Sequence, residues 1–119
     1  MPGVSLRERL RAALPTAMKA RDRTAVSALR STLSAIDNAE AVDRPAGVDR
    51  GLAIEQSAVG VGATEVARRE LSDDDVEHIV RAEIAERETA AAGYAESGRV
   101  EPAERLRAEA AVLTALIER

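Results

Sequence analysis

The 119-residue chain has no cysteine, no phenylalanine and no tryptophan, and Tyr94 is its one aromatic residue. Without cysteine, disulfides, thiolate zinc sites and cysteine nucleophiles are excluded. A single ring also excludes a platform on which successive nucleic-acid bases stack. No apolar run approaches the roughly 18 residues of a membrane span, and no charged-then-apolar leader opens the chain. We therefore expect one soluble, cytoplasmic domain.

What the chain does contain is aliphatic and charged. Hydrophobic residues make up 45% and charged residues 32% of the sequence, which is enough to bury a core of Leu, Ile, Val and Ala. Residues 1–42 carry a net charge of +3, residues 43–69 are balanced, and residues 70–119 carry −7. A basic N-terminal third and an acidic C-terminal part can steer a polyanion to the basic end of the molecule. Ordinary charged helix surfaces are the simpler interpretation of so small an excess.

The first half predicts two helices, over about residues 5–21 and 23–42. Ser5 and Glu8 form a capping box, and Asp22 suits the N-cap of the second helix. Their apolar stripes recur at helical spacing and comprise Leu6, Leu10, Leu14, Ala17 and Met18, then Val26, Leu29, Leu33 and Ile36.

Two features interrupt this helical pattern. Pro15 lies inside the first predicted helix and predicts a kink or a local break there. Residues 43–69 contain Pro and scattered Gly without a clean period. We interpret them as a partly ordered connector that lays a few apolar side chains on the bundle. A short strand or hairpin around residues 57–61 and a gating loop are the alternatives.

The second half predicts helices over about residues 72–97 and 101–118. Gly98 is suited to end the first of these helices. Glu101 is suited to the N-cap of the second helix, and Pro102 to its first helical position. Ser72 and Asp75 form a second capping box. The stripe of the first of these helices comprises Val76, Ile79, Val80, Ile84, Arg87, Ala91 and Tyr94. The stripe of the second comprises Leu106, Ala110, Leu113, Leu116 and Ile117. Because so few residues separate these helices, they should form an antiparallel hairpin. The sequence thus predicts an all-α domain, a small bundle of four main helices.

Few residues carry candidate chemistry. His78 is the only histidine and has no ligand set at helical spacing, so a solvent-facing position is expected. The acidic triplet 73–75 is explained by the positive end of a helix dipole. Phosphate-binding glycine motifs and a nucleophile elbow are absent. We expect no cofactor, no metal and no self-contained active site.

One charged residue interrupts an apolar stripe. Arg87 lies eleven residues before Gly98, and Glu109 lies eleven after it. In an antiparallel hairpin the two therefore stand at the same height, which predicts a partly buried Arg87–Glu109 ion pair. By the same geometry, Tyr94 should meet Arg105 or Leu106.

Further polar residues end or flank the stripe of the second helix, and they are Arg30, Asn38 and Glu40. Together with Arg87, Tyr94 and Glu109 they are interpreted either as contacts that lock helix register or as a polar patch for a partner.

These positions also carry a family resemblance. The quoted segments are Ala17-Met18-Lys19, Asp22, the run LRSTLSAIDNAE over 29–40, Glu70-Leu71-Ser72-Asp73, Arg87-Glu88, Tyr94, Gly98-Arg99, Glu104 and Glu109. In order and spacing they resemble the YqeY-like (GatB/YqeY) proteins. The resemblance covers roughly residues 6–42 and 70–117. It leaves out the connector, which looks longer than is usual in that family.

The resemblance implies an all-helical domain related to the tail region of the GatB and GatE subunits of tRNA-dependent amidotransferases. Family members are commonly labelled with carbon–nitrogen ligase activity, glutamine being the amido donor. Typical members continue past the fourth helix through a Leu-Pro turn into a small C-terminal helical domain. This sequence ends at Arg119, so we expect only the N-terminal helical domain.

Three hypotheses for function follow. The first is a non-catalytic module that binds tRNA or an amidotransferase complex through basic residues of the first half, namely Arg7, Arg11, Lys19, Arg21, Arg23 and Arg30. The second is a protein–protein or homo-oligomeric module without a tRNA role, favoured by alanine-rich helix faces. The third is a stand-alone amidotransferase, which has the family label behind it but no visible catalytic residues.

Overall fold

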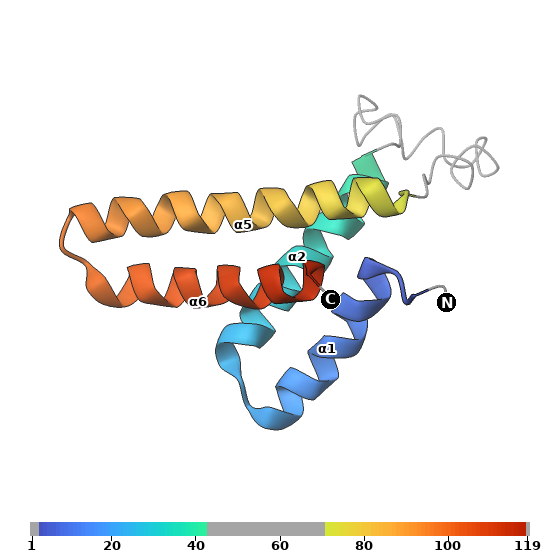
Figure 1. Ribbon diagram of the computed structural model, residues 1–119, viewed down its shortest axis with the longest axis horizontal. Coiled ribbons are helices and arrows are strands. Elements are labelled where there is room, and N and C mark those ends of the chain that lie inside the picture. The colour runs from blue at the N-terminus through green and yellow to red at the C-terminus, as the bar shows by residue number, and fades with distance from the viewer. Residues whose placement is uncertain (1–2, 43–70, 119) are drawn as a thin grey trace, which may run out of the picture.

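The computed structural model describes residues 3–42 and 71–118, and these form four helices (Figure 1). They are α1 (Leu6–Ala20), α2 (Arg23–Val42), α5 (Asp73–Glu96) and α6 (Val100–Ile117). The fold is an all-α bundle, as predicted. The expectations for residues 43–69, including a strand near 57–61, lie outside the described residues. Within the described part, none of the helices combines the length and apolar character needed to cross a bilayer.

Two helical hairpins build the bundle. The long helices α5 and α6 run antiparallel and in close contact, and α2 packs across them while α1 lies beside α2 (Figure 1). Gly98 joins α5 to α6 with a φ of 79°, a left-handed conformation that glycine adopts without steric cost. Arg21 ends α1 in the same conformation, with a φ of 59°. The predicted hairpin of the last two helices is therefore confirmed.

Polar side chains start three of the helices as the sequence predicts. Both capping boxes are present, with Ser5 paired to Glu8 and Ser72 paired to Asp75. The Asp22 carboxylate accepts a hydrogen bond from the backbone N–H of Ala25 at 3.1 Å. These contacts satisfy N–H groups that have no partner inside the helix.

The start of α6 corrects a prediction. Glu101 was expected to be the N-cap, but the N-cap lies two residues earlier, at Arg99, whose side chain makes no capping hydrogen bond. Pro102 lies inside the first turn, where its missing N–H costs nothing.

The proline inside α1 does not break it. The helix is continuous from Leu6 to Ala20 across Pro15, so of the two expected alternatives the local break is wrong, and a kink remains a prediction. Pro15 lies on the exposed side of α1, where solvent can hydrate the carbonyl group that loses its N–H partner.

The core lies where α1 and α2 meet the α5–α6 hairpin. Its largest fully buried aliphatic side chains come from all four helices and are Leu10, Leu29, Ile36, Val76, Val80 and Leu113. Buried alanines such as Ala28, Ala91 and Ala103 leave room for the helices to approach closely. The predicted stripes are therefore correct in most positions.

Met18 is the main exception among the predicted core residues. Its side chain is 49% exposed, whereas its neighbour Ala17 is buried. Consecutive helix residues point about 100° apart, and the inner stripe of α1 ends at Ala17 because the chain reverses direction at Arg21. Met18 therefore faces outward.

A buried hydroxyl group gives the first testable prediction. The Oγ1 atom of Thr32 is buried and has no hydrogen-bond partner among the described residues. Because an unpaired buried polar group costs about 1–3 kcal/mol, Thr32→Val should raise the free energy of unfolding by about 1 kcal/mol. Chemical denaturation measures this change. Thr89→Val is the matched control, because Thr89 is exposed on α5 and should change stability by less than about 0.5 kcal/mol. A loss of stability in Thr32→Val would contradict the assignment.

Candidate functional site

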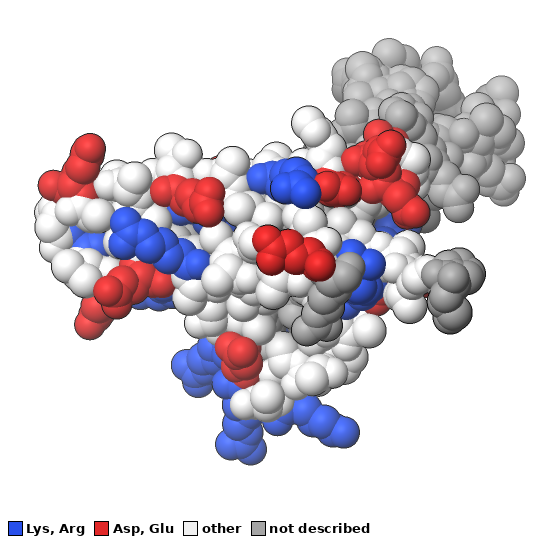
Figure 2. All heavy atoms as spheres, in the orientation of Figure 1, with Lys and Arg blue, Asp and Glu red and all other residues white. Residues whose placement is uncertain are grey.

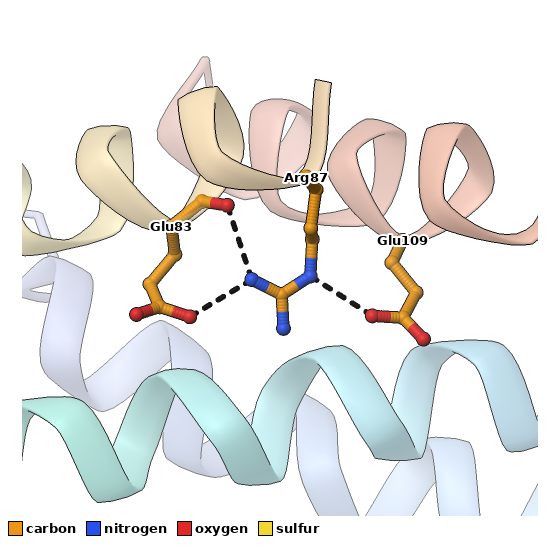
Figure 3. Close-up of polar contacts among 3 residues, drawn as sticks. All are labelled: Glu83, Arg87 and Glu109. Carbon is orange, nitrogen blue, oxygen red and sulfur yellow. Dashed lines mark hydrogen bonds and ion pairs between the residues drawn. The ribbon is translucent and has the colours of Figure 1, made fainter. Parts of the chain in front are cut away.

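The most deeply buried charges form one network between α5 and α6 (Figure 3). Arg87 Nε donates to Glu109 Oε1 at 2.9 Å, and its Nη1 donates to Glu83 Oε1 at 2.8 Å. The same Nη1 also donates to the Glu83 backbone carbonyl at 3.0 Å. The predicted Arg87–Glu109 ion pair is therefore confirmed, and both side chains are only 9% exposed.

The electrostatics of this network favour a charged guanidinium. Burial opposes the charge and by itself lowers the pKa of Arg87. Hydrogen bonds and Coulombic attraction from Glu83 and Glu109 outweigh this effect, so the pKa lies above its ordinary value. One guanidinium held between two carboxylates is a locking contact: it offers no unpaired base or nucleophile.

Sequence reasoning missed Glu83. Its signal was available, because Glu83 precedes Arg87 by four residues, the spacing at which helix side chains of opposite charge meet. Because Arg87 interrupts the apolar stripe that faces the neighbouring helix, its partner was sought on that helix and not on its own.

A second ion pair joins the start of α1 to the end of α2. The Arg7 guanidinium contacts the Glu40 carboxylate, and both side chains are largely buried. This explains why Glu40 ends the apolar stripe of α2. Arg7 thus differs from the other cations predicted to contact RNA in having an ion pair within the described residues.

A third arginine joins α1 to the end of α6, and sequence reasoning missed it. Arg9 Nε donates to the carbonyl oxygen of Leu116 at 3.1 Å, and Nη1 donates to that of Val4 at 2.9 Å. Carbonyl groups at a helix C-terminus lack intrahelical donors and carry partial negative charge, so a guanidinium stabilises them.

The remaining polar positions are less constrained. Tyr94 is half-buried, and the guanidinium of Arg99 lies 5.3 Å from the centre of its ring, a cation–π contact. Contact of Tyr94 with Arg105 or Leu106 remains a prediction. Asn38 is exposed, which does not favour a role in locking the helices.

Five exposed cations lie on α1, α2 and the turn between them. We call them the basic face, and they are Arg11, Lys19, Arg21, Arg23 and Arg30. None has an ion pair within residues 3–42 and 71–118. Figure 2 shows Lys and Arg side chains gathered at the lower end of the molecule, where α1 meets α2, while Asp and Glu side chains are spread along the α5–α6 hairpin.

The other sequence candidates do not converge. His78 is exposed on α5, as expected. The described residues contain no group of three His, Cys, Asp or Glu side chains arranged to hold a metal ion. A shallow groove between α5 and α6 is lined by Arg81, Ile84, Ala85, Glu88, Thr114 and Ile117, among others.

The Arg87 network predicts strong energetic coupling. Removing one partner leaves a buried charge, so Arg87→Ala and Glu109→Ala should each destabilise the protein by about 3–5 kcal/mol. A double-mutant cycle measured by denaturation should give a coupling energy of about 1–3 kcal/mol. The exposed Arg81–Glu77 pair on α5 is the matched control and should couple by less than about 0.5 kcal/mol. Additive effects of Arg87→Ala and Glu109→Ala would refute the lock.

Comparisons of the chain with protein-family models, with curated proteins and with solved structures found no match in any of the three.

Proposed function

We propose that this chain is a non-catalytic helical module of GatB/YqeY type that binds tRNA through the basic face, in the setting of tRNA-dependent amidation. The resemblance to the GatB/YqeY motifs supports the link to tRNA-dependent amidation, and the charge distribution supports the basic face as the binding surface. In this proposal the carbon–nitrogen ligase chemistry of the family label belongs to partner proteins.

The observation that carries the proposal is the contrast between engaged acids and free cations in α1 and α2. Glu8 and Asp22 cap helices, and Glu40 pairs with Arg7. Asp37 is the exception, because it is exposed and follows Arg30 by seven residues on the same side of α2. The five cations of the basic face are exposed and unpaired within the described residues, so their charge is available to a polyanion.

The buried ionisable groups support a binding role over a catalytic one. Arg87 is saturated by Glu83 and Glu109, and Arg7 contacts Glu40. Each group therefore stabilises helix packing. A general base or a nucleophile instead needs access to substrate and a pKa tuned to its task.

Binding to tRNA should depend steeply on salt. Each phosphate contact contributes about 0.7–0.9 to the slope of log K against log salt, so Lys19→Gln/Arg23→Gln should lower the slope by about 1.5. Fluorescence anisotropy with labelled tRNA at several salt concentrations measures it. Arg105→Gln/Arg107→Gln removes two exposed cations from α6 and should leave the slope unchanged. Absence of tRNA binding at low salt would refute the proposal.

The α5–α6 groove favours one alternative, a protein–protein or homo-oligomeric module without a tRNA role. Its floor includes the partly buried Ile84 and Ile117 and the exposed Ala85. This alternative predicts a mass of two or more chains that rises with concentration in light scattering and is lost in Ala85→Glu. A single-chain mass at every concentration would remove its homo-oligomeric version.

A further inference from the structure

Met18 lies within the basic face. It follows Arg11 by seven residues on α1, and Arg30 follows Arg23 by seven residues on α2. Residues seven apart share one side of a helix, two turns or roughly 10 Å apart. The Nη2 atom of Arg30 lies 4.0 Å from the Met18 sulfur, which brings these two stripes together on one surface.

The environment of Met18 differs from that of the other exposed aliphatic side chains. Val4 and Val100 are 55% and 59% exposed, but Val4 precedes α1, and Val100 begins α6 with Glu101 next to it. Met18 has Lys19 beside it and Arg21 ending the same helix. A flexible, polarisable thioether beside the Arg30 guanidinium, on the part of the surface that carries the basic face, presents one apolar contact within a field that attracts anions.

We propose that Met18 packs against the face of an unpaired RNA base while Arg11, Lys19, Arg23 and Arg30 hold the neighbouring phosphates. This inference rests on the proposed function and names the part of the tRNA that the surface recognises. A nucleotide combines a base, whose ring faces are apolar, with an anionic phosphate. The surface presents an apolar side chain, Met18, next to cations that complement the phosphate. One methionine provides a single contact, which is compatible with the absence of a stacking platform.

The base must be unpaired because the base faces inside a duplex are already stacked. Proteins reach bases in RNA mainly in loops, bulges and ends, where the rings are splayed out. A fully paired RNA therefore offers phosphates to the cations and nothing to Met18. The same surface should distinguish the two kinds of RNA through one residue.

The test compares tRNA with a fully paired RNA duplex across a range of salt concentrations. Met18→Ser should weaken tRNA binding by about threefold to tenfold at every salt concentration, with an unchanged slope. Met18→Leu should restore most of the affinity. Val100→Ser is the matched control and should bind like the unmodified chain. Duplex binding should be the same for all four proteins. Circular dichroism with thermal melts establishes that each variant is folded.

The outcomes separate this inference from the proposed function. If the unmodified chain binds tRNA and Met18→Ser binds it equally well, the base contact is refuted and tRNA binding stands. If Met18→Ser weakens duplex binding as much as tRNA binding, recognition of an unpaired base is refuted. If the unmodified chain binds neither RNA, both proposals fall.

Discussion

One guanidinium links the two long helices at the most deeply buried charges of the described structure. Arg87 reaches from α5 to Glu109 on α6 while Glu83 on its own helix holds its other edge, and Figure 3 shows all three side chains projecting toward α2. Two antiparallel helices with alanine-rich faces have several registers of similar packing energy. A slip of either helix would leave buried charges without partners, at a cost larger than most packing differences. The network therefore selects one register, and the fork geometry of arginine suits it to bridge two carboxylates.

Arginine performs three different structural tasks in this small protein. Arg87 sets the register of the hairpin, Arg7 ties α1 to α2, and Arg9 ties α1 to the last turn of α6. All three use the long aliphatic stem to reach another element while the charge meets an oxygen. Exposed cations also occur on the α5–α6 hairpin, but exposed acidic side chains outnumber them there. On α1, α2 and the turn between them the exposed cations outnumber the exposed acids, and this contrast polarises the surface.

Sequence patterns predicted the helices and their ends well because these depend on local chemistry. Capping boxes, the Asp22 cap and Gly98 act within a few residues, and the hairpin geometry alone located Glu109 opposite Arg87. Two of the failures have a common cause, whereas the N-cap of α6 and the contact of Glu83 with Arg87 are local features. Whether Met18 is buried, and what Glu40 contacts, depends on how α1 lies against the other helices, which no local pattern specifies. For the same reason the sequence did not indicate that Arg7, whose side chain is 21% exposed, pairs with Glu40.

The contact between Arg9 and the Leu116 carbonyl joins residues 107 positions apart and brings the first turn of α1 beside the last turn of α6 (Figure 1). Both ends of the described chain consequently emerge from one side of the bundle. A fluorophore attached near Val4 and a second one attached near Leu116 would therefore lie close together, at the opposite side of the molecule from the α5–α6 turn (Figure 1).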